Sequence, residues 1–267
     1  MSGAPEAAAG LSASVVMYGG ADEVHQCLES LAAHTAGGNP AGSLALYLVD
    51  NASPGGALDA LKAQGVPEGT TVLELPQNRG YGAGHNAVLP LLKSRYHVVS
   101  NPDILLRDDA IGAMAAWMDD HPDVVMACPR LLFPDGREQH IAKRRPALLP
   151  LLARQLRLGF LKKYEDHYLM RDEDLSRPVD VAFCSGSFFM VRTEVFRRMG
   201  GFDEGYFMYV EDADITQKAL HYGRAVFLPQ VAVTHAWHRD AHRRPRQFWW
   251  QVRSMLRYFG KWGFRLR

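Results

Sequence analysis

Three carboxylates, Glu211, Asp212 and Asp214, stand where an aromatic cluster gives way to a helical pattern. Residues 215–220 contain good helix formers and the preceding residues do not, so we expect a helix to begin beside these carboxylates. Simple capping is one explanation, because the free amide groups of a helix N-terminus favour negative charge. The other is chemical: a carboxylate held at a helix start and walled by aromatic rings is a positioned general base for a hydroxyl group. For the chemical explanation to hold, the chain must also have a second set of polar residues that binds the other substrate.

A second set of polar residues follows the predicted strands in the N-terminal part of the chain. Apolar and β-branched runs predict strands at residues 12–18, 44–49, 71–75 and 97–100. Helical patterns lie between them, including residues 22–34 and a helix that runs from the segment 78–86 through Leu92, and strand-like runs follow at residues 225–228 and 231–233. Strands that alternate with helices form a mostly parallel sheet. Ligands bind outside the carboxyl ends of such strands, so we expect the polar residues beyond these ends to converge on one rim.

The polar residues of this rim suit a bound nucleotide. Asp50 ends the second strand and could accept hydrogen bonds from a base or ribose, or could form an Asx turn before Pro54. The glycine-rich run 79–86 lets the backbone approach a ligand closely, although it matches neither a Walker loop nor the dinucleotide fingerprint. After the fourth strand, Asn101-Pro102-Asp103 is either an ordinary turn or the metal-binding part of the site.

Length and composition predict one domain in a reducing compartment. The 267 residues, 47% of them apolar, are enough for one large α/β domain with a buried core. Cys27, Cys128 and Cys184 lie far apart and form no C-x-x-C pair, which argues against structural zinc. Residues 1–10 lack the basic and apolar parts of a signal peptide, and no apolar run approaches the ~20 residues that span a bilayer. We therefore expect a cytoplasmic protein.

Basic residues are concentrated in two segments, although the net charge is only +1. Residues 141–163 carry seven Lys or Arg and residues 243–267 carry eight, and neither segment has an acidic residue. The rest of the chain has 15 basic and 29 acidic residues, so the two segments indicate an anionic partner surface. An apolar stripe from Leu149 to Phe160 is either a core helix or a helix lying on anionic lipid. In the second segment aromatic residues alternate with arginines, which suits a membrane interface.

Three motifs of the central stretch together resemble the inverting family 2 glycosyltransferases, and the resemblance covers most of the chain. The motifs are GSFFMVR from Gly186 to Arg192, GGFDE from Gly200 to Glu204 and YVEDAD from Tyr209 to Asp214. They imply a single GT-A-like α/β domain over residues 1–267. Residues 11–104 would form a mostly parallel nucleotide-binding half, residues 105–246 an acceptor-binding half with a mixed sheet, and residues 247–267 a basic, aromatic helical tail.

The resemblance also implies roles for individual residues. Asp212 would be the general base with Glu211 beside it, whereas Asp214 would cap the helix. Asp103 stands where these enzymes carry a D-x-D motif and would hold Mg2+ or Mn2+. His235 would complete that metal site, or alternatively contact a phosphate at the rim. The residues expected beside the nucleotide sugar are Asp50, Asn51, Arg79, Gly80, Tyr81, Gly84, Asn86 and Asn101.

The implied reaction moves a sugar from a nucleotide-diphosphate donor to a lipid-linked saccharide in cell-surface polysaccharide synthesis. The tail resembles the ends of bacterial rhamnosyltransferases of O-antigen assembly, so rhamnose is the sugar that the resemblance suggests. Such an enzyme would be a peripheral protein on the inner face of the plasma membrane. One departure bears on the donor nucleotide: family members usually have Tyr-Asn after the first strand, whereas this chain has Tyr18-Gly19-Gly20.

Other classes of protein fit the sequence less well. A sugar nucleotidyltransferase carries a Gly-rich loop with Lys or Arg near its start, which residues 14–23 lack. A catalytically silent adaptor would not need the intact carboxylates of the two sites. A zinc site at His235, His238 and His242 would have neither a helical apolar frame nor cysteine partners. Neither basic segment contains a recognised nucleic-acid-binding module, so we expect no nucleic-acid partner.

Overall fold

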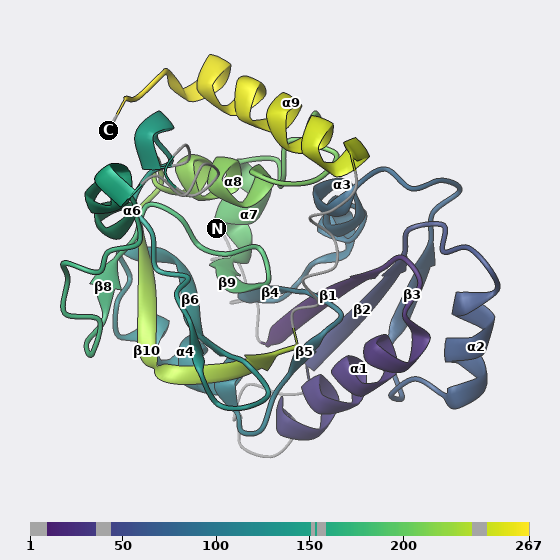
Figure 1. Cartoon of the computed structure of the whole chain (residues 1–267). Coiled ribbons are helices and arrows are strands. Elements are labelled where there is room, and N and C mark those ends of the chain that lie inside the picture. The colour runs from purple at the N-terminus through teal and green to yellow at the C-terminus, as the bar shows by residue number, and fades with distance from the viewer. Residues whose placement is uncertain (1–9, 36–43, 151–152, 154–158, 237–244, 267) are drawn as a thin grey trace, which may run out of the picture.

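The computed structural model describes residues 10–35, 44–150, 153, 159–236 and 245–266 (Figure 1). Its centre is a curled ten-stranded sheet whose main path has the order β3-β2-β1-β4-β9-β6-β10-β5, with β7 paired to β6 and β8 to β10. The strands are β1 (Leu11–Met17), β2 (Leu44–Asp50), β3 (Thr71–Glu74), β4 (Tyr96–Ser100), β5 (Ile104–Leu105), β6 (Val124–Leu132), β7 (Glu138–Gln139), β8 (Val179–Asp180), β9 (Phe188–Arg192) and β10 (Arg224–His235). The helices are α1 (Ala21–Thr35), α2 (Ala57–Gln64), α3 (Tyr81–Asn86), η1 (Leu89–Leu91), α4 (Ala110–Asp119), η2 (Gly159–Leu161), α6 (Lys162–Tyr168), α7 (Thr193–Arg198), α8 (Glu211–Ala219) and α9 (Pro245–Trp262).

The sheet is parallel in its first half and mixed in its second. Strands β3, β2, β1 and β4 run parallel to one another, and every residue of β1 and β4 is buried. Continuous apolar runs of this kind are typical of parallel strands that are covered on both faces. In the second half, β9 is antiparallel to β4 and β6, whereas β10 is parallel to β6. The expected mostly parallel sheet that becomes mixed is confirmed.

Two predicted elements differ in extent from the observed ones. The helix predicted to run from the glycine-rich segment through Leu92 ends at Asn86 and gives way to the 3-10 helix η1. Pro90 lies inside η1, and proline cannot supply the amide that a continuing α-helix needs. Conversely, the two strands predicted near the C-terminus form the single strand β10, whose register against β6 shifts between Leu228 and Ala232. Pro229 lies within this shift and has no amide to donate to a neighbouring strand.

One continuous hydrophobic cluster includes buried residues from both halves of the sheet, from Leu11 in β1 to Val233 in β10. A smaller cluster of Phe183, Tyr206, Ala213 and Tyr258 joins the C-terminal helix α9 to α8. Figure 1 shows α9, in yellow, lying across α8 at one end of the molecule. The tail is therefore helical, as expected, and it packs against the element that carries the candidate catalytic carboxylates.

The two basic segments are described in part. In the first, Leu152, Arg154, Leu156 and Arg157 lie outside the described residues, while Phe160 is exposed. In the second, residues 243, 244 and 267 lie outside them, as do His238 and His242, which precede this segment. Within the described ranges, no helix combines the length and the apolar character needed to cross a bilayer.

Candidate active site

A strained turn sets the start of α8. Tyr209 and Val210 have φ angles of 71° and 67°, in the left-handed region that β-branched residues such as valine rarely adopt. Helix α8 begins at the next residue, Glu211, as the sequence predicts. Strain of this kind costs about 1–3 kcal/mol for each residue and is concentrated at functional sites. Here it turns the chain so that Glu211 and Asp212 both line one pocket.

Asp212 is held by the backbone on both sides of its carboxylate. Oδ2 accepts a hydrogen bond from the Gly186 amide at 3.1 Å, and Oδ1 accepts one from the Ala213 amide at 2.9 Å. A Cβ atom on residue 186 would lie 3.1 Å from the Asp212 Cβ, so glycine permits this close approach. Two motifs that are distant in sequence, GSFFMVR and YVEDAD, thus meet at one carboxylate.

The two neighbouring carboxyl groups are both buried, but their surroundings affect their pKa values differently. It raises the pKa of Glu211, and the adjacent Asp212 charge raises it further. Burial also raises the pKa of Asp212, but there the positive charge of Lys143 and the amides of Gly186 and Ala213 favour the ionised form. Asp212 is therefore the better candidate for the ionised member of the pair, and Glu211 for the protonated one.

The expectation that Asp214 caps α8 is wrong. The helix begins three residues earlier, and the Asp214 side chain is fully buried on the side that faces α9. Its carboxylate accepts hydrogen bonds from the Trp262 Nε1–H at 2.7 Å, from Lys261 Nζ at 2.9 Å and from the Tyr206 hydroxyl at 3.2 Å. Asp214 therefore joins α8 to the C-terminal helix and has no role at the helix start.

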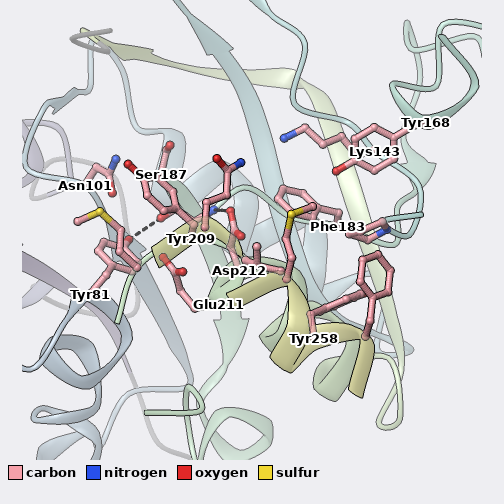
Figure 2. A pocket seen from close by; sticks show the side chains of 17 residues that line it. Tyr81, Asn101, Lys143, Tyr168, Phe183, Ser187, Tyr209, Glu211, Asp212 and Tyr258 are labelled. Carbon is pink, nitrogen blue, oxygen red and sulfur yellow. Dashed lines mark hydrogen bonds between the residues drawn. The ribbon is translucent and has the colours of Figure 1, made fainter. Parts of the chain in front are cut away.

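The two carboxylates line a pocket of about 400 Å³ that is built from both ends of the chain (Figure 2). In this view Tyr81 and Asn101 lie on one side of Glu211 and Asp212, while Lys143, Tyr168, Phe183 and Tyr258 lie on the other. The other residues that line the pocket are Pro146, Gly186, Ser187, Met208, Tyr209, Val210, Gln251, Met255 and Phe259. The pocket thus runs from the rim of the parallel half, past the carboxylates, to the inner face of α9.

Among the residues predicted to contact the nucleotide, Asp50 and Asn51 form the turn after β2. Asp50 Oδ1 accepts the Ser53 amide at 3.1 Å, so the carboxylate closes a local turn before Pro54. The Asn51 side chain donates to the Gly80 carbonyl at 3.0 Å and accepts the Arg79 amide at 3.0 Å. The β2 turn and the glycine-rich run are therefore fastened to each other, and Asn51 shapes the rim.

The residues of the glycine-rich run have different surroundings. Tyr81 reaches the pocket, where its hydroxyl donates to the Gly186 carbonyl at 2.5 Å. A Cβ on Gly80 would lie 2.2 Å from the Phe207 carbonyl, and one on Gly84 would lie 2.7 Å from Val16, so both glycines are needed for close packing. Arg79 and Asn86 are directed to the exposed Glu204, outside the pocket lining.

Asp103 and His235, expected to hold a metal, lie together although 132 residues separate them in the chain. Oδ1 of Asp103 is 3.4 Å from Nε2 of His235, and the side-chain nitrogen Nδ2 of Asn101 is 3.5 Å from the same ring nitrogen. The side-chain Nε2 of Gln139 donates a hydrogen bond to the backbone carbonyl of His235. The Oε1 of Gln139 lies 2.9 Å from His235 Nδ1 and therefore accepts a hydrogen bond from an Nδ1–H. Nε2 then carries the lone pair that faces Asp103, which is the arrangement that a metal-binding histidine requires.

These two side chains fit a divalent cation whose other ligands come from substrate. Within the described residues, no group of three or more His, Cys, Asp or Glu side chains surrounds a potential metal position. Mg2+ and Mn2+ commonly use one or two protein ligands together with phosphate oxygens and water, so a pair of ligands is sufficient.

The sequence alone did not reveal several residues that line the pocket. Lys143 lies in a basic segment that pointed only to an anionic surface, and Phe183 precedes the recognised motifs. The residues of α9 that line the pocket, Gln251, Met255, Tyr258 and Phe259, were expected at a membrane interface. Their spacing at positions i, i+4, i+7 and i+8 is that of one helix face, which is the signal that could have identified them.

Comparison with known proteins places these features in a family. The sequence model of the family described as Glycosyl transferase family 2 matches residues 12–200. The chain is 26% identical to the rhamnosyltransferase WbbL of Escherichia coli over 68% of its own length and 70% of that protein. It is 28% identical to the N-acetylglucosaminyl-diphospho-decaprenol L-rhamnosyltransferase of Mycobacterium tuberculosis, over 72% of this chain and 66% of that protein.

A solved structure shows the same fold at low sequence identity. The mannosyltransferase PcManGT of Pyrobaculum calidifontis, in complex with GDP-Man and Mn2+, superposes with a TM-score of 0.59 and 17% identity. The match covers 94% of this chain and 63% of that one, so the present chain spans less than two thirds of that structure. The GT-A-like fold expected from the sequence is confirmed.

Proposed function

This chain belongs to glycosyl transferase family 2, and from that premise we propose that it transfers a sugar from a nucleotide-diphosphate donor to a saccharide hydroxyl with inversion. The observation that carries the proposal is the position of Asp212. Its carboxylate is fixed by the Gly186 amide at the centre of a pocket that extends to both sides of it. A donor on the Tyr81 and Asn101 side and an acceptor on the α9 side would meet at this carboxylate.

Asp212 acts as the general base in the proposed reaction. It takes the proton of the acceptor hydroxyl while that oxygen forms a bond to C1 of the donor sugar. The bond from C1 to the diphosphate breaks on the opposite face, and its electron pair leaves with the diphosphate, so the anomeric configuration inverts. Glu211, protonated because burial raises its pKa, keeps the pocket from carrying two adjacent negative charges.

Asp103 and His235 are the proposed ligands for Mg2+ or Mn2+, with Asn101 beside them. A divalent cation held there would neutralise the charge that develops on the departing diphosphate. Asp50, Asn51 and the glycine-rich run shape the rim on which the nucleotide would lie. Arg79 and Asn86, which contact Glu204, would contribute by holding this rim in place.

Rhamnose is the proposed sugar, and a lipid-linked saccharide of cell-surface polysaccharide synthesis is the proposed acceptor. The two relatives described above are named as rhamnosyltransferases, and the name of the mycobacterial enzyme specifies a diphospho-decaprenol acceptor. In this proposal residues 11–104 bind the donor and residues 105–246 bind the acceptor. Residues 247–267 close the acceptor side through α9.

The outer face of α9 supports a peripheral position on the inner face of the plasma membrane. Trp249 and Leu256 are 68% and 69% exposed, and residues 243–267 contain eight basic and no acidic residues. Large apolar side chains among basic ones are typical of helices that lie in an anionic lipid interface. The membrane would then present the lipid-linked acceptor beside the pocket.

A donor screen tests the proposed reaction. Purified protein is incubated with a panel of nucleotide sugars and a polyprenyl-diphosphate-linked saccharide, with and without Mn2+, and release of nucleoside diphosphate is measured. We expect release with one donor, dependent on the acceptor and enhanced by Mn2+. Binding of a donor without any turnover would indicate instead that the chain is a catalytically silent adaptor.

A further inference from the structure

The pocket carries one positive charge, and it lies on the side away from the donor rim. Among the described residues that line the pocket, Lys143 is the only Lys, Arg or His. Figure 2 shows it beyond the two carboxylates, near Tyr168 and Phe183. Its Nζ lies 4.2 Å from the centre of the Phe183 ring, and residues 143 and 183 are also joined by a β-bridge. The bridge therefore fixes the backbone of residue 143, and the Phe183 ring lies against its ammonium group.

The neighbours of Lys143 in the basic segment are used for structure. Arg144 forms ion pairs with Asp172 at 2.6 Å and Glu173 at 2.5 Å, and Arg145 donates to the carbonyl of Trp262 at the end of α9. Neither arginine lines the pocket. Of the three consecutive cations, only Lys143 is directed to the site of the reaction.

Apolar side chains surround the Lys143 side of the pocket. Tyr168, Phe183 and Tyr258 come from separate parts of the chain and lie there in Figure 2, and Phe259 packs against the cluster that contains Phe183 and Tyr258. The two carboxylates lie between this side and Asn101 (Figure 2). A ligand that fits both sides has a polar, hydroxyl-bearing part, then a negative charge, then an apolar part.

We propose that Lys143 binds the phosphate that links the acceptor saccharide to its lipid, and that the surrounding apolar residues bind the first carbon atoms of that lipid. This inference rests on the proposed function, since it assigns a site to the acceptor of that reaction. Such a molecule would place its attacked hydroxyl at Asp212 and both its phosphate and its first lipid carbons on the Lys143 side, where the apolar side chains lie. A phosphate that contacts a lysine in a partly buried pocket gains a charge-assisted hydrogen bond.

Calorimetric titration with farnesyl diphosphate tests the site without requiring turnover. The nucleotide side is first saturated with nucleoside diphosphate and Mn2+, so that farnesyl diphosphate reports on the remaining part of the pocket. Lys143→Gln should weaken the affinity for farnesyl diphosphate by about tenfold to a hundredfold, the usual worth of a hydrogen bond to a charged group. Lys143→Arg, which keeps the charge, should recover much of the loss. Lys163→Gln is the matched control, because it removes an exposed lysine of the same basic segment that does not line the pocket.

A parallel titration with nucleoside diphosphate alone separates the two possible sources of the phosphate. An unchanged affinity for nucleoside diphosphate in Lys143→Gln, with weakened farnesyl diphosphate binding, supports the acceptor site. An equal loss for both ligands would mean that Lys143 only balances the charge of Glu211 and Asp212, and no loss for either would mean that it binds no phosphate. Both results overturn the inference.

The proposed function can fail separately from this inference. If the unmodified protein binds no nucleoside diphosphate, the donor site is wrong, yet farnesyl diphosphate titrated alone still tests Lys143. Inorganic pyrophosphate completes the set of ligands. If it binds as tightly as farnesyl diphosphate, the apolar residues contribute nothing and the site does not extend to the lipid chain.

Discussion

At the scale of single residues, Asp212 and Glu211 are predicted to differ in function although they are adjacent. Asp212→Asn keeps the shape of the side chain but removes the group that accepts the proton. We expect turnover to fall by about 10² to 10⁴, the usual contribution of a general base, while the affinity for the donor is retained. Steady-state rates and donor titration measure the two quantities.

Glu211→Gln is the matched control for that variant. Because burial raises the pKa of Glu211, glutamine resembles its protonated form, and we expect a much smaller loss of turnover. The reverse result, near-normal turnover in Asp212→Asn and a large loss in Glu211→Gln, would assign the base to Glu211.

The Asp103 and His235 pair predicts that donor affinity depends on a divalent cation. Asp103→Ala should remove the gain in nucleotide affinity that Mn2+ provides and leave the metal-independent part of binding. Calorimetry of nucleoside diphosphate binding with and without Mn2+ measures this gain, and Asp120→Ala is a control at an exposed carboxylate. Equal affinity with and without metal in the unmodified protein would show that the pair does not serve as a metal site.

Much of this site could be predicted from the sequence, because its polar residues follow strands or begin a helix. The position of Asp103 after β4 and of Asp212 at the start of α8 follows from local patterns. The role of Asp214 does not, because its partners Lys261 and Trp262 are about 50 residues away and only the packing of α9 brings them together. Lys143 was missed for a similar reason, since the direction of one cation in a basic run depends on the β-bridge to Phe183.

At the scale of elements, the contact between α8 and α9 depends on Asp214. Asp214→Asn keeps the volume but removes the charge that pairs with Lys261, and it turns an amide toward groups that donate hydrogen bonds. We expect a loss of about 1–3 kcal/mol in the free energy of unfolding. Because α9 lines the pocket, we also expect a higher KM for the acceptor with little change for the donor.

Two measurements check the role of Asp214. Urea unfolding gives the loss of stability, and limited proteolysis shows whether cleavage is accelerated within α9 specifically. Asp120→Asn is the control at an exposed position. A loss of stability with unchanged acceptor KM would mean that the contact supports the fold and does not position α9 at the pocket.

A buried network between β1, β4 and α3 predicts that the fold is sensitive to acid. Ser14 Oγ lies 2.7 Å from Nδ1 of His85 and 2.9 Å from Nε2 of His97, and all three residues are fully buried. Burial lowers the pKa of His85 well below its usual value and that of His97 to about 3. Between these values and the unfolded pKa of about 6.5, the unfolded chain binds protons that the folded chain does not.

Stability should therefore fall as the pH is lowered below about 6.5, by up to about 1.4 kcal/mol per pH unit for each histidine. Urea unfolding at several pH values between 7.5 and 5 measures the slope before most carboxylates titrate. His97→Gln should reduce the slope, whereas His140→Gln, at an exposed histidine, should leave it unchanged. An equal slope in the two variants would assign the acid sensitivity to other groups.

Helices and strands could be predicted where a local sequence pattern determines them, and not where distant parts of the chain do. The first four strands and α1 lie close to their predicted bounds, because each depends on a local apolar period. The predictions for the extent of β10 and the end of α3 were wrong because Pro229 lies within β10 and Pro90 follows α3, and the effect of each proline depends on its surroundings. The spacing of residues 251, 255, 258 and 259 marks one face of α9, but the packing of this face over the pocket depends on long-range contacts such as that between Asp214 and Trp262.

At the scale of the whole molecule, the inner face of α9 lines the pocket and its outer face is exposed. Tyr258 on the inner face is 1% exposed, whereas Trp249 and Leu256 are among the most exposed large apolar side chains of the described residues. The same helix would thus contact the acceptor on one side and lipid on the other. A membrane surface in contact with α9 would lie beside the apolar side of the pocket.

Liposome flotation without acceptor tests this arrangement. The protein should float with anionic vesicles at low salt and lose this association as salt rises, because each nearby Lys or Arg contributes about 1 kcal/mol that ions screen. Leu256→Ser together with Trp249→Ser should weaken flotation strongly, since the two changes remove apolar surface and no charge. Leu91→Ser, at an exposed leucine in η1, is the control. Flotation that occurs only when the lipid-linked acceptor is added would mean that the enzyme reaches the membrane through its substrate. Flotation that is weakened equally in the control variant would mean that the apolar outer face of α9 has another partner.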